Sequence, residues 1–506
     1  MIAFIDRMLN RVTMYRLVVY YLMFLIGIAT ILSFGGVLAY DPFAIMFSVG
    51  FLVAVCWGTN QLLAWSFGVA PASDSTYITA LILGLIITPI EGYGDLWFLG
   101  WAGALAMCSK YLLAIDRKHL FNPAAAAVAI TYLTVNQSAS WWVGNPMLLP
   151  FVLVGGLLIV RKIHRGAMVA TFLAATVAST LLLSLALGEN PATTLWKTLI
   201  YAPLFFFAFV FITEPLTTPP TRGWQLIYGG LVGLLSAPQV HLGSFYVTPE
   251  LAIIAGNVLA YIVSPKARLV LRLKEKIQLA PDIYDFVFQP AGRLAFAPGQ
   301  YMEWTLGHRE PDNRGNRRYF TLASAPSEDE IRIGVKFYQQ SSSYKRAMLA
   351  MRGSSEIMAG QLAGDFTLPS DTAQRCVLIA GGVGITPFRS MIKHLLDTGQ
   401  RRPITLLYSN RTARDIVYQD VFDRAREELG IKVIYTVTDK SKAPANWKGR
   451  VGRITPQLIQ AEAPDYQRCI FYLSGPPGMV DSFKETLREL KVPSSHIRTD
   501  FFSGLA

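Results

Sequence analysis

Charged residues are divided very unevenly along this chain, and that division constrains the fold more than any other feature. Residues 1–265 contain 11 Lys+Arg and 9 Asp+Glu, whereas residues 266–506 contain 35 and 25. About one residue in thirteen is charged in the first part, against about one in four in a typical soluble domain. These values exclude a single water-soluble globule, a disordered chain and a fibrous repeat. They predict a polytopic α-helical membrane domain over 1–265 and a water-soluble part over 266–506.

Long apolar stretches fill the first part. The first runs from Leu17 to about Tyr40, which is too long for the apolar region of a signal peptide, and no cleavage site follows it. Nine further stretches follow at roughly 43–66, 76–90, 96–115, 123–135, 147–160, 168–187, 196–213, 224–238 and 248–263. We therefore predict ten helices, several of them too short to cross about 30 Å of hydrocarbon at about 1.5 Å per residue.

Basic residues indicate how these helices are oriented. With the N-terminus in the cytoplasm, the inner loops hold Arg117, Lys118, Arg161, Lys162, Arg165, Arg222, Lys266 and Arg268. The outer loops carry acidic residues or little charge, and only Lys197 lies on the outer side. Because basic loops remain in the cytoplasm, both ends of the membrane domain are expected on the cytoplasmic side of a cell inner membrane, together with the soluble part.

The membrane domain also contains a diverged two-fold repeat. Asn122-Pro123 begins the fifth stretch and Thr248-Pro249 begins the tenth, while Thr88-Pro89 and Thr213-Glu214-Pro215 end short stretches in the two halves. Short, Pro-interrupted helices at corresponding positions indicate a central site between the repeats. The alternative is that each Pro only caps a helix where it meets a loop.

Three segments, Ser109-Lys110, Phe121-Asn122-Pro123 and Phe211 to Pro219, resemble the Nqr B/Rnf D family of membrane flavoproteins. The resemblance covers about 1–265 and implies flavin held within the membrane, electron conduction, and flavin contacts from Lys110, Asn122, Glu214 and Thr217. That family attaches FMN to a Thr preceded by Gly-Ala, a motif absent here. A non-covalent membrane flavin, FMN or riboflavin, is therefore expected.

The soluble part shows two successive patterns after a linker around 264–269. Short alternating apolar runs over about 269–371 predict a small antiparallel β-barrel. From Arg375, a strand, a Gly-rich turn and a helix are followed by strands at 405–408, 433–437 and 470–473, which predicts an open parallel α/β sheet. The expected domains are therefore 266–371 and 372–506.

Four motifs in the soluble part suit a flavin and a dinucleotide. Arg318-Tyr319-Phe320-Thr321 offers a cation for a pyrophosphate, an aromatic ring for an isoalloxazine and a hydroxyl for flavin N5. Ser341-Ser342-Ser343 begins a helix whose free N–H groups suit the same pyrophosphate. Gly381-Gly382-Val383-Gly384-Ile385-Thr386 and Ser474-Gly475 end two strands at one sheet edge, where a dinucleotide phosphate can approach the backbone.

Together these motifs resemble the ferredoxin–NADP reductase superfamily over about 267–506. The resemblance implies FAD on the barrel and NAD(P)H on the α/β domain. The Arg-x-Tyr-Ser/Thr motif of that family appears here with Phe320 for Tyr, and its Cys-Gly motif appears as Ser474-Gly475. Asp500-Phe501 resembles its acidic–aromatic terminus, which borders the flavin. Thr321, Ser474 and Asp500 are thereby expected to be the catalytic residues.

Other classes of cofactor and partner are disfavoured. Cys56, Cys108, Cys376 and Cys469 form no Cys-x-x-Cys and no Cys/His cluster, which argues against a metal site. A haem-containing ferric reductase would need paired His on facing helices, and His119, His164 and His241 are predicted at loops or helix ends. No nucleic-acid recognition motif accompanies the positive charge, which suits anionic lipid headgroups instead.

The sequence therefore predicts an NAD(P)H-dependent transmembrane flavin oxidoreductase. Electrons would pass through FAD and a membrane flavin to an extracytoplasmic acceptor, either a flavoprotein or a quinone. The alternatives are a transporter or ion pump with a redox-sensing reductase domain, and an NAD(P)H:quinone-type reductase. Asn410-Arg411 suits a 2′-phosphate or a simple turn, so NADH and NADPH both remain open.

Overall fold

The computed structural model of this protein describes residues 12–68, 73–115, 118–264, 269–290, 294–308 and 315–500, together with residues 5, 8, 9, 292 and 312. The chain divides into two compact units, Met1–Arg268 and Leu269–Ala506. Arg117, Lys266 and Arg268 of the charge argument, and Phe501 of the flavin motif, lie outside the described residues.

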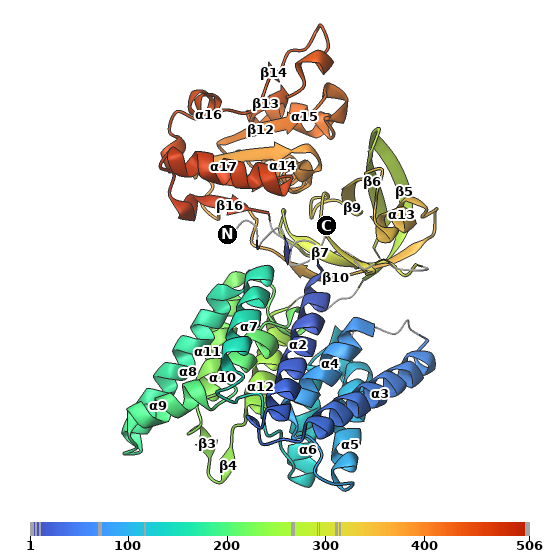
Figure 1. The fold of residues 1–506 in the computed structure, drawn as a ribbon. Helices are drawn as coiled ribbons and strands as arrows, with labels where there is room; N and C mark the ends of the chain where they lie inside the picture. Colours follow the sequence, from blue (N-terminus) through green and yellow to red (C-terminus); the bar gives the residue numbers. More distant parts are fainter. Residues whose placement is uncertain are drawn as a thin grey trace. The chain divides into compact units, whose positions relative to one another are not determined.

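The first unit is helical (Figure 1). Its helices are α2 (Met14–Phe34), α3 (Pro42–Ser66), α4 (Ser73–Ile86), α5 (Asp95–Leu112), α6 (Pro123–Val135), α7 (Leu149–Ile163), α8 (Gly166–Ala186), α9 (Pro191–Ile200), α10 (Leu204–Phe206), the π-helix η1 (Phe207–Phe211), the 3-10 turn η2 (Pro215–Thr217), α11 (Arg222–Leu235) and α12 (Pro249–Val263). Two short hairpins, β1–β2 (Ala114–Ile115 and Lys118–His119) and β3–β4 (His241–Leu242 and Phe245–Tyr246), precede α6 and α12.

Helix length separates these elements into two groups. Among the described residues, α2, α3 and α8 are the three helices long and apolar enough to cross a membrane. The stretch predicted as one helix over 196–213 is instead a pair, Pro191–Ile200 and Leu204–Phe211, bent by 59°. Pro203, which precedes α10, explains this correction, because proline has no N–H with which to continue a helix. A domain of ten spans therefore stays a prediction.

Contacts between helices follow the same scheme in both halves of this unit. In the first half α3 contacts α4 and α5, and α5 contacts α6; in the second half α8 contacts α9 and α11, and α11 contacts α12. The α8–α11 contact is close, since a Cβ on Gly229 would lie 2.6 Å from the Met168 carbonyl oxygen and one on Gly233 would lie 2.5 Å from that of Phe172. Small residues four apart are the usual means by which membrane helices approach backbone to backbone.

The second unit begins with an antiparallel six-stranded sheet in the order β8-β7-β10-β5-β6-β9. The strands are β5 (Leu269–Ala280), β6 (Ile283–Gln289), β7 (Tyr301–Thr305), β8 (Arg317–Thr321), β9 (Ile331–Lys336) and β10 (Glu356–Ala363), with α13 (Ser343–Leu349) before the last. Alternate side chains such as Phe286, Phe288 and Trp304 point inward and form its core.

A parallel six-stranded sheet follows, in the order β14-β13-β12-β11-β15-β16. Its strands are β11 (Cys376–Gly381), β12 (Ile404–Asn410), β13 (Lys432–Val437), β14 (Arg450–Val451), β15 (Ile470–Ser474) and β16 (Ile497–Thr499). Leu378 and Leu406 pack on α14 (Thr386–Thr398) and α15 (Gln419–Leu429), while Ile379 and Leu473 pack with α16 (Pro456–Glu462) and α17 (Pro477–Glu489). Helices thus cover both faces, as is usual for buried parallel sheets (Figure 1).

Candidate functional site

The parallel sheet has a topological switch point between β11 and β15. Chain order runs from β11 through β12 to β13 on one side, and to β15 and β16 on the other. The loops after β11 and β15 therefore meet at the carboxyl edge, which is where open α/β sheets bind ligands. A Cβ on Gly384 would lie 2.5 Å from both the Ser474 carbonyl oxygen and the Gly475 nitrogen. The two predicted nucleotide-binding loops are therefore in direct backbone contact.

The glycines of the first loop occupy their positions for different physical reasons. Gly382 has a φ of +55° with open space beside it, a conformation that glycine adopts without strain. Gly381 has no such space, because a Cβ there would lie 2.3 Å from the Met479 sulfur. Thr386 begins α14, and its hydroxyl donates to the Val383 carbonyl at 3.2 Å. Of Gly381, Gly382 and Gly384, Gly382 is the one with open space where a Cβ would lie, so a ligand can approach its backbone on that side.

The carboxylate of Asp500 brings the three predicted catalytic residues together. Thr321 comes from β8, Ser474 from β15, and Asp500 from the segment after β16. The hydroxyls of Thr321 and Ser474 donate to the same Oδ2 atom of Asp500, at 3.2 and 3.3 Å. The other oxygen, Oδ1, is buried and has no hydrogen-bond partner among the described residues. Burial raises the pKa of Asp500 to about 7, although the two hydroxyl bonds oppose that rise. This carboxyl group can therefore gain or lose a proton near neutral pH.

The barrel residues of the flavin motif lie on both faces of β8. Arg318 is 1% exposed, its Nη1 donates to the Arg317 carbonyl at 2.6 Å, and its guanidinium lies 4.9 Å from the Tyr344 ring centre. Phe320 also contacts Tyr344, with ring centres 6.3 Å apart. Tyr319 points to the opposite face, where its hydroxyl donates to Glu303 at 2.8 Å. Tyr344 directly follows Ser343 in the sequence motif, but no role was predicted for its side chain.

The serines before α13 organise its first turn. Ser342 is the N-cap and accepts from the Lys345 N–H at 3.2 Å, while Ser341 donates to the Tyr338 carbonyl at 2.6 Å. The Ser343 N–H, expected to be available for a pyrophosphate, donates to Asp312 Oδ2 at 2.9 Å. A ligand phosphate at this nitrogen would have to replace that carboxylate.

In the first unit, three of the four predicted flavin-binding residues meet. Asn122 Nδ2 and Thr217 Oγ1 donate to the same Oε2 atom of Glu214, at 2.8 and 2.9 Å. His119 Nε2 lies 3.8 Å from the other carboxylate oxygen. Lys110 contacts a different element, because its Nζ donates to the backbone and hydroxyl of Ser75, both at 3.0 Å.

Asn257 of α12 completes this cluster and was not predicted. Its Oδ1 accepts from the Asn122 N–H at 2.9 Å, and its Nδ2 donates to the Thr217 carbonyl at 3.0 Å and to the Tyr228 hydroxyl at 3.3 Å. Asn257 is 1% exposed. An asparagine in the middle of a helix that is apolar for the two turns before it is the sequence signal that could have identified it.

Residues 378–485 match the family described as the oxidoreductase NAD-binding domain. A flavohemoprotein of Deinococcus radiodurans is 28% identical over 238 residues, which are 46% of this chain and 58% of that protein. The reductase subunit of glycine betaine monooxygenase from Chromohalobacter salexigens is 26% identical over 241 residues, which are 46% of this chain and 64% of that subunit. This chain thus spans less than two thirds of the length of either relative.

Among solved structures, the flavohem-like FAD/NAD-binding domain of nitric oxide dioxygenase from Vibrio cholerae O1 biovar El Tor is 23% identical, with a TM-score of 0.41. The match covers 46% of this chain and 98% of that one. The sequence matches cover the switch-point loops, both of which lie within residues 378–485. Over about 46% of its length this chain is thus similar to a flavohemoprotein and to a monooxygenase reductase subunit, and residues 378–485 within that part match the oxidoreductase NAD-binding domain.

Proposed function

We propose that this protein is an NAD(P)H-dependent flavin oxidoreductase with FAD on its barrel. One observation carries the proposal: Thr321 of the barrel and Ser474 of the nucleotide domain share the Asp500 carboxylate at the switch point. A flavin ring and a nicotinamide ring have to meet between these two domains for hydride to pass. Similarity of this half to reductase components supports the same activity.

The residues present fit a flavin dinucleotide. The Arg318 guanidinium suits its pyrophosphate, Phe320 suits its ring, and the Gly382 backbone suits the phosphates of NAD(P)H. When bound, FAD would supply the capacity to accept a hydride and to release electrons one at a time. Thr321 and Ser474 would then orient the two rings by their hydroxyls. Asp500 would hold or release the accompanying proton at its buried Oδ1 atom.

Thr321→Val tests this assignment, since valine keeps the shape of threonine and removes its hydroxyl. A lost hydrogen bond of about 1 kcal/mol or more should slow flavin reduction by NAD(P)H about fivefold to tenfold. Bound FAD should stay at the wild-type amount. Anaerobic stopped-flow spectroscopy on the purified full chain measures the rate, and extraction measures the flavin.

The matched control for this experiment is Thr398→Val. The Thr398 hydroxyl donates to a carbonyl within its own helix, α14, away from the switch point. The Thr398→Val protein should reduce its flavin at the wild-type rate. Equal rates for Thr321→Val and wild type, or a wild-type protein without FAD, would contradict the proposed function.

We further propose that the first unit lies in the cytoplasmic membrane, with its N-terminus and the reductase half on the cytoplasmic side. Large apolar side chains on α2 and α3 support a lipid environment: Ile31, Phe43 and Trp65 are 66%, 66% and 81% exposed. A bilayer would cover such surface, which water would not favour. The basic residues of the predicted inner loops support this orientation of the first unit, because basic loops remain in the cytoplasm.

Within that unit we propose a non-covalent flavin at the cluster of Asn122, Glu214, Thr217 and Asn257. Asn122 lies where α6 begins, Glu214 and Thr217 lie where the helix before Pro215 ends, and Asn257 lies within α12. Broken helices leave backbone polar groups that a lipid-facing segment could not tolerate, but that a cofactor can bind. The carrier would pass electrons from FAD to an extracytoplasmic flavoprotein or quinone.

One observation favours an ion-coupled version of this function. Glu250 at the start of α12 is 1% exposed; its Oε2 accepts from Trp141 Nε1 at 3.2 Å, and its Oε1 has no hydrogen-bond partner among the described residues. Buried carboxyl groups within membrane helices commonly serve ion or proton movement. Coupling of electron flow to ion transport is therefore the second candidate.

A further inference from the structure

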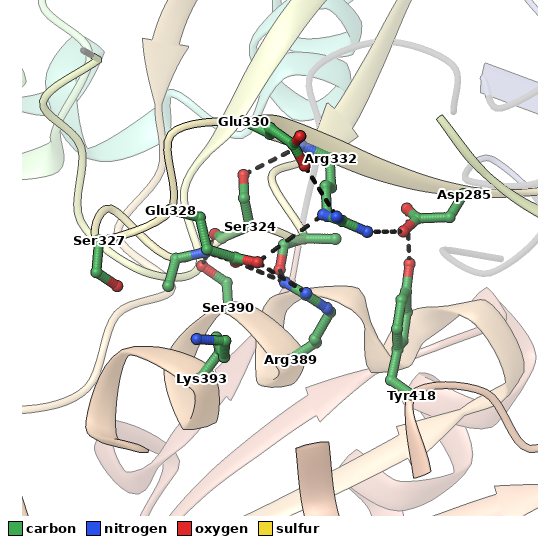
Figure 2. Close-up of polar contacts among 12 residues, drawn as sticks. Asp285, Ser324, Ser327, Glu328, Glu330, Arg332, Arg389, Ser390, Lys393 and Tyr418 are labelled. Carbon is green, nitrogen blue, oxygen red and sulfur yellow. Dashed lines mark hydrogen bonds and ion pairs between the residues drawn. The ribbon is translucent and has the colours of Figure 1, made fainter. Parts of the chain in front are cut away.

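A mostly buried ion pair joins the nucleotide domain to the barrel (Figure 2). Arg389 of α14 is 5% exposed, and its Nη1 and Nη2 donate to the two carboxylate oxygens of Glu328 at 2.8 and 3.0 Å. The same Nη1 donates to the Ala323 carbonyl at 2.6 Å. Ser390, the next residue, donates to the Ser324 carbonyl at 2.6 Å. The first half of α14 is thus fixed to the barrel segment that follows β8.

A second contact lies beside the first. Tyr418, just before α15, donates to Asp285 Oδ1 of β6 at 3.0 Å, while Arg332 of β9 donates to the other oxygen at 3.2 Å. The Arg389 guanidinium lies 5.2 Å from the Tyr418 ring centre. Figure 2 shows these side chains as one continuous set. The two domains are therefore joined by oriented bonds rather than by apolar contact alone.

Gly334 of β9 allows a close approach between the domains. A Cβ at this position would lie 2.8 Å from both the Thr386 methyl carbon and the Tyr418 hydroxyl oxygen. Real Cβ contacts are longer, so any side chain here would push Thr386 away from the barrel. Thr386 belongs to the predicted nucleotide loop, and the barrel therefore contacts that loop directly.

The position of these contacts along the chain gives them a functional meaning. Arg389 lies one helical turn after Thr386, and Ala323 follows Thr321 by two residues. The ion pair therefore connects the start of the nicotinamide-binding helix to the end of the strand that carries the flavin-facing hydroxyl. Bidentate arginine–carboxylate pairs fix both distance and angle. Hydride transfer depends steeply on both, and a misplacement of about 1 Å can cost about a hundredfold in rate.

We propose that Arg389 and Glu328, with the close approach at Gly334, are positioning residues that set the geometry of hydride transfer from NAD(P)H to FAD. The inference rests on the proposed function. A positioning role of this pair differs from a purely structural role in one measurable respect. Loss of the pair should slow the transfer step at saturating NAD(P)H, while the amount of bound FAD and the Kd for NAD(P)H stay unchanged.

Two variants of the full-length protein test this inference. Arg389→Lys keeps the positive charge but loses the two-pronged geometry, and Gly334→Ala adds one methyl group where β9 approaches Thr386 and Tyr418. Each should lower the limiting rate of FAD reduction about tenfold or more in anaerobic single-turnover experiments. Each should also weaken the charge-transfer absorbance that a stacked nicotinamide–flavin pair gives.

The control is Arg424→Lys on α15. Arg424 forms a similar pair with Glu428 at 3.0 Å, but the two side chains are 58% and 48% exposed. This variant should keep the wild-type rate. Wild-type rates in both Arg389→Lys and Gly334→Ala would overturn the inference and leave the proposed function intact. A slower rate that only follows lost FAD or weaker NAD(P)H binding would also overturn it. Absence of FAD reduction in the wild type would overturn the proposed function itself.

Discussion

Among single residues, Asp500 has the chemistry that depends most on its surroundings. One of its oxygens accepts from both Thr321 and Ser474, the other is buried, and its pKa is raised from 3.8 to about 7. The folded protein therefore binds a proton here more tightly than the unfolded chain does. By linkage, the contribution of this group to stability is greatest at low pH and is lost as the pH rises towards 7.

Asp500→Asn should remove that pH dependence, because asparagine is neutral at every pH. Relative to wild type, the thermal midpoint of the variant should rise between about pH 4 and pH 7 and remain level above that. Thermal unfolding of the purified protein across this range measures the difference. Asp481→Asn, at a side chain that is 73% exposed, is the control. A difference that does not change with pH would contradict the raised pKa.

The residues of the site differ in how far the sequence could predict them. Thr321 and Ser474 are each the last residue of a strand and each belong to a sequence motif. The motif therefore already indicates that these side chains lie where a strand ends, at the edge of a sheet. Arg389 and Glu328 are 61 residues apart, and Asp285 and Tyr418 are 133 apart. No periodicity or motif links such pairs, since they meet only when two domains pack together. The interdomain contacts therefore could not have been predicted from one sequence.

Among the elements, the two loops at the switch point show why similar glycines differ in effect. Gly382 needs a left-handed backbone but has space, whereas Gly384 touches the backbone of Ser474 and Gly475. The motif alone placed both beside the dinucleotide. The structure adds that Gly384 is required by the contact between the loops themselves.

Gly384→Ala should therefore be more damaging than Gly382→Ala. The first requires a backbone shift that separates the loops after β11 and β15, whereas the second adds a left-handed alanine at about 1–2 kcal/mol. Thermal unfolding followed by flavin fluorescence should show the larger loss for Gly384→Ala, together with a higher KM for NAD(P)H. Equal losses in the two variants would contradict this account of the loop contact.

Apolar stretches located the helices of the first unit well but not their breaks. The predicted 123–135 matches α6, because Asn122 and Pro123 are strong start signals. The bend near Pro203 was missed, because the apolar composition continues through it. Composition records which residues avoid water, whereas a bend depends on how neighbouring helices pack.

At the scale of the whole molecule, the proposed path joins FAD reduction in one unit to a carrier in the other. Replacing Asn122 and Thr217 together by Leu should leave NAD(P)H reduction of FAD intact, because both residues belong to the first unit. Electron delivery across the membrane should fail. Inside-out vesicles loaded with an impermeant acceptor separate these two steps in one stopped-flow experiment.

The matched control replaces Thr134 and Thr171 by Leu. Their hydroxyls donate to carbonyls four residues earlier in α6 and α8, so they take no part in the cluster. This variant should reduce the enclosed acceptor at the wild-type rate. Unimpaired reduction by the Asn122/Thr217 variant, or extraction of only one flavin per wild-type chain, would show that the electron path lies elsewhere.

The backbone contact between α8 and α11 has a consequence for motion. With the carbonyls of Met168 and Phe172 against Gly229 and Gly233, these two helices pack backbone to backbone, which leaves little room for one to move against the other. A conformational change in the first unit would therefore need its hinges at the interrupted segments, near Pro203 and at Pro215–Thr217. The second of these segments carries Thr217 of the proposed flavin site. If the proposed flavin binds there, any movement that opened a path for ions would displace it, so that ion transport and electron transfer would alternate rather than proceed independently.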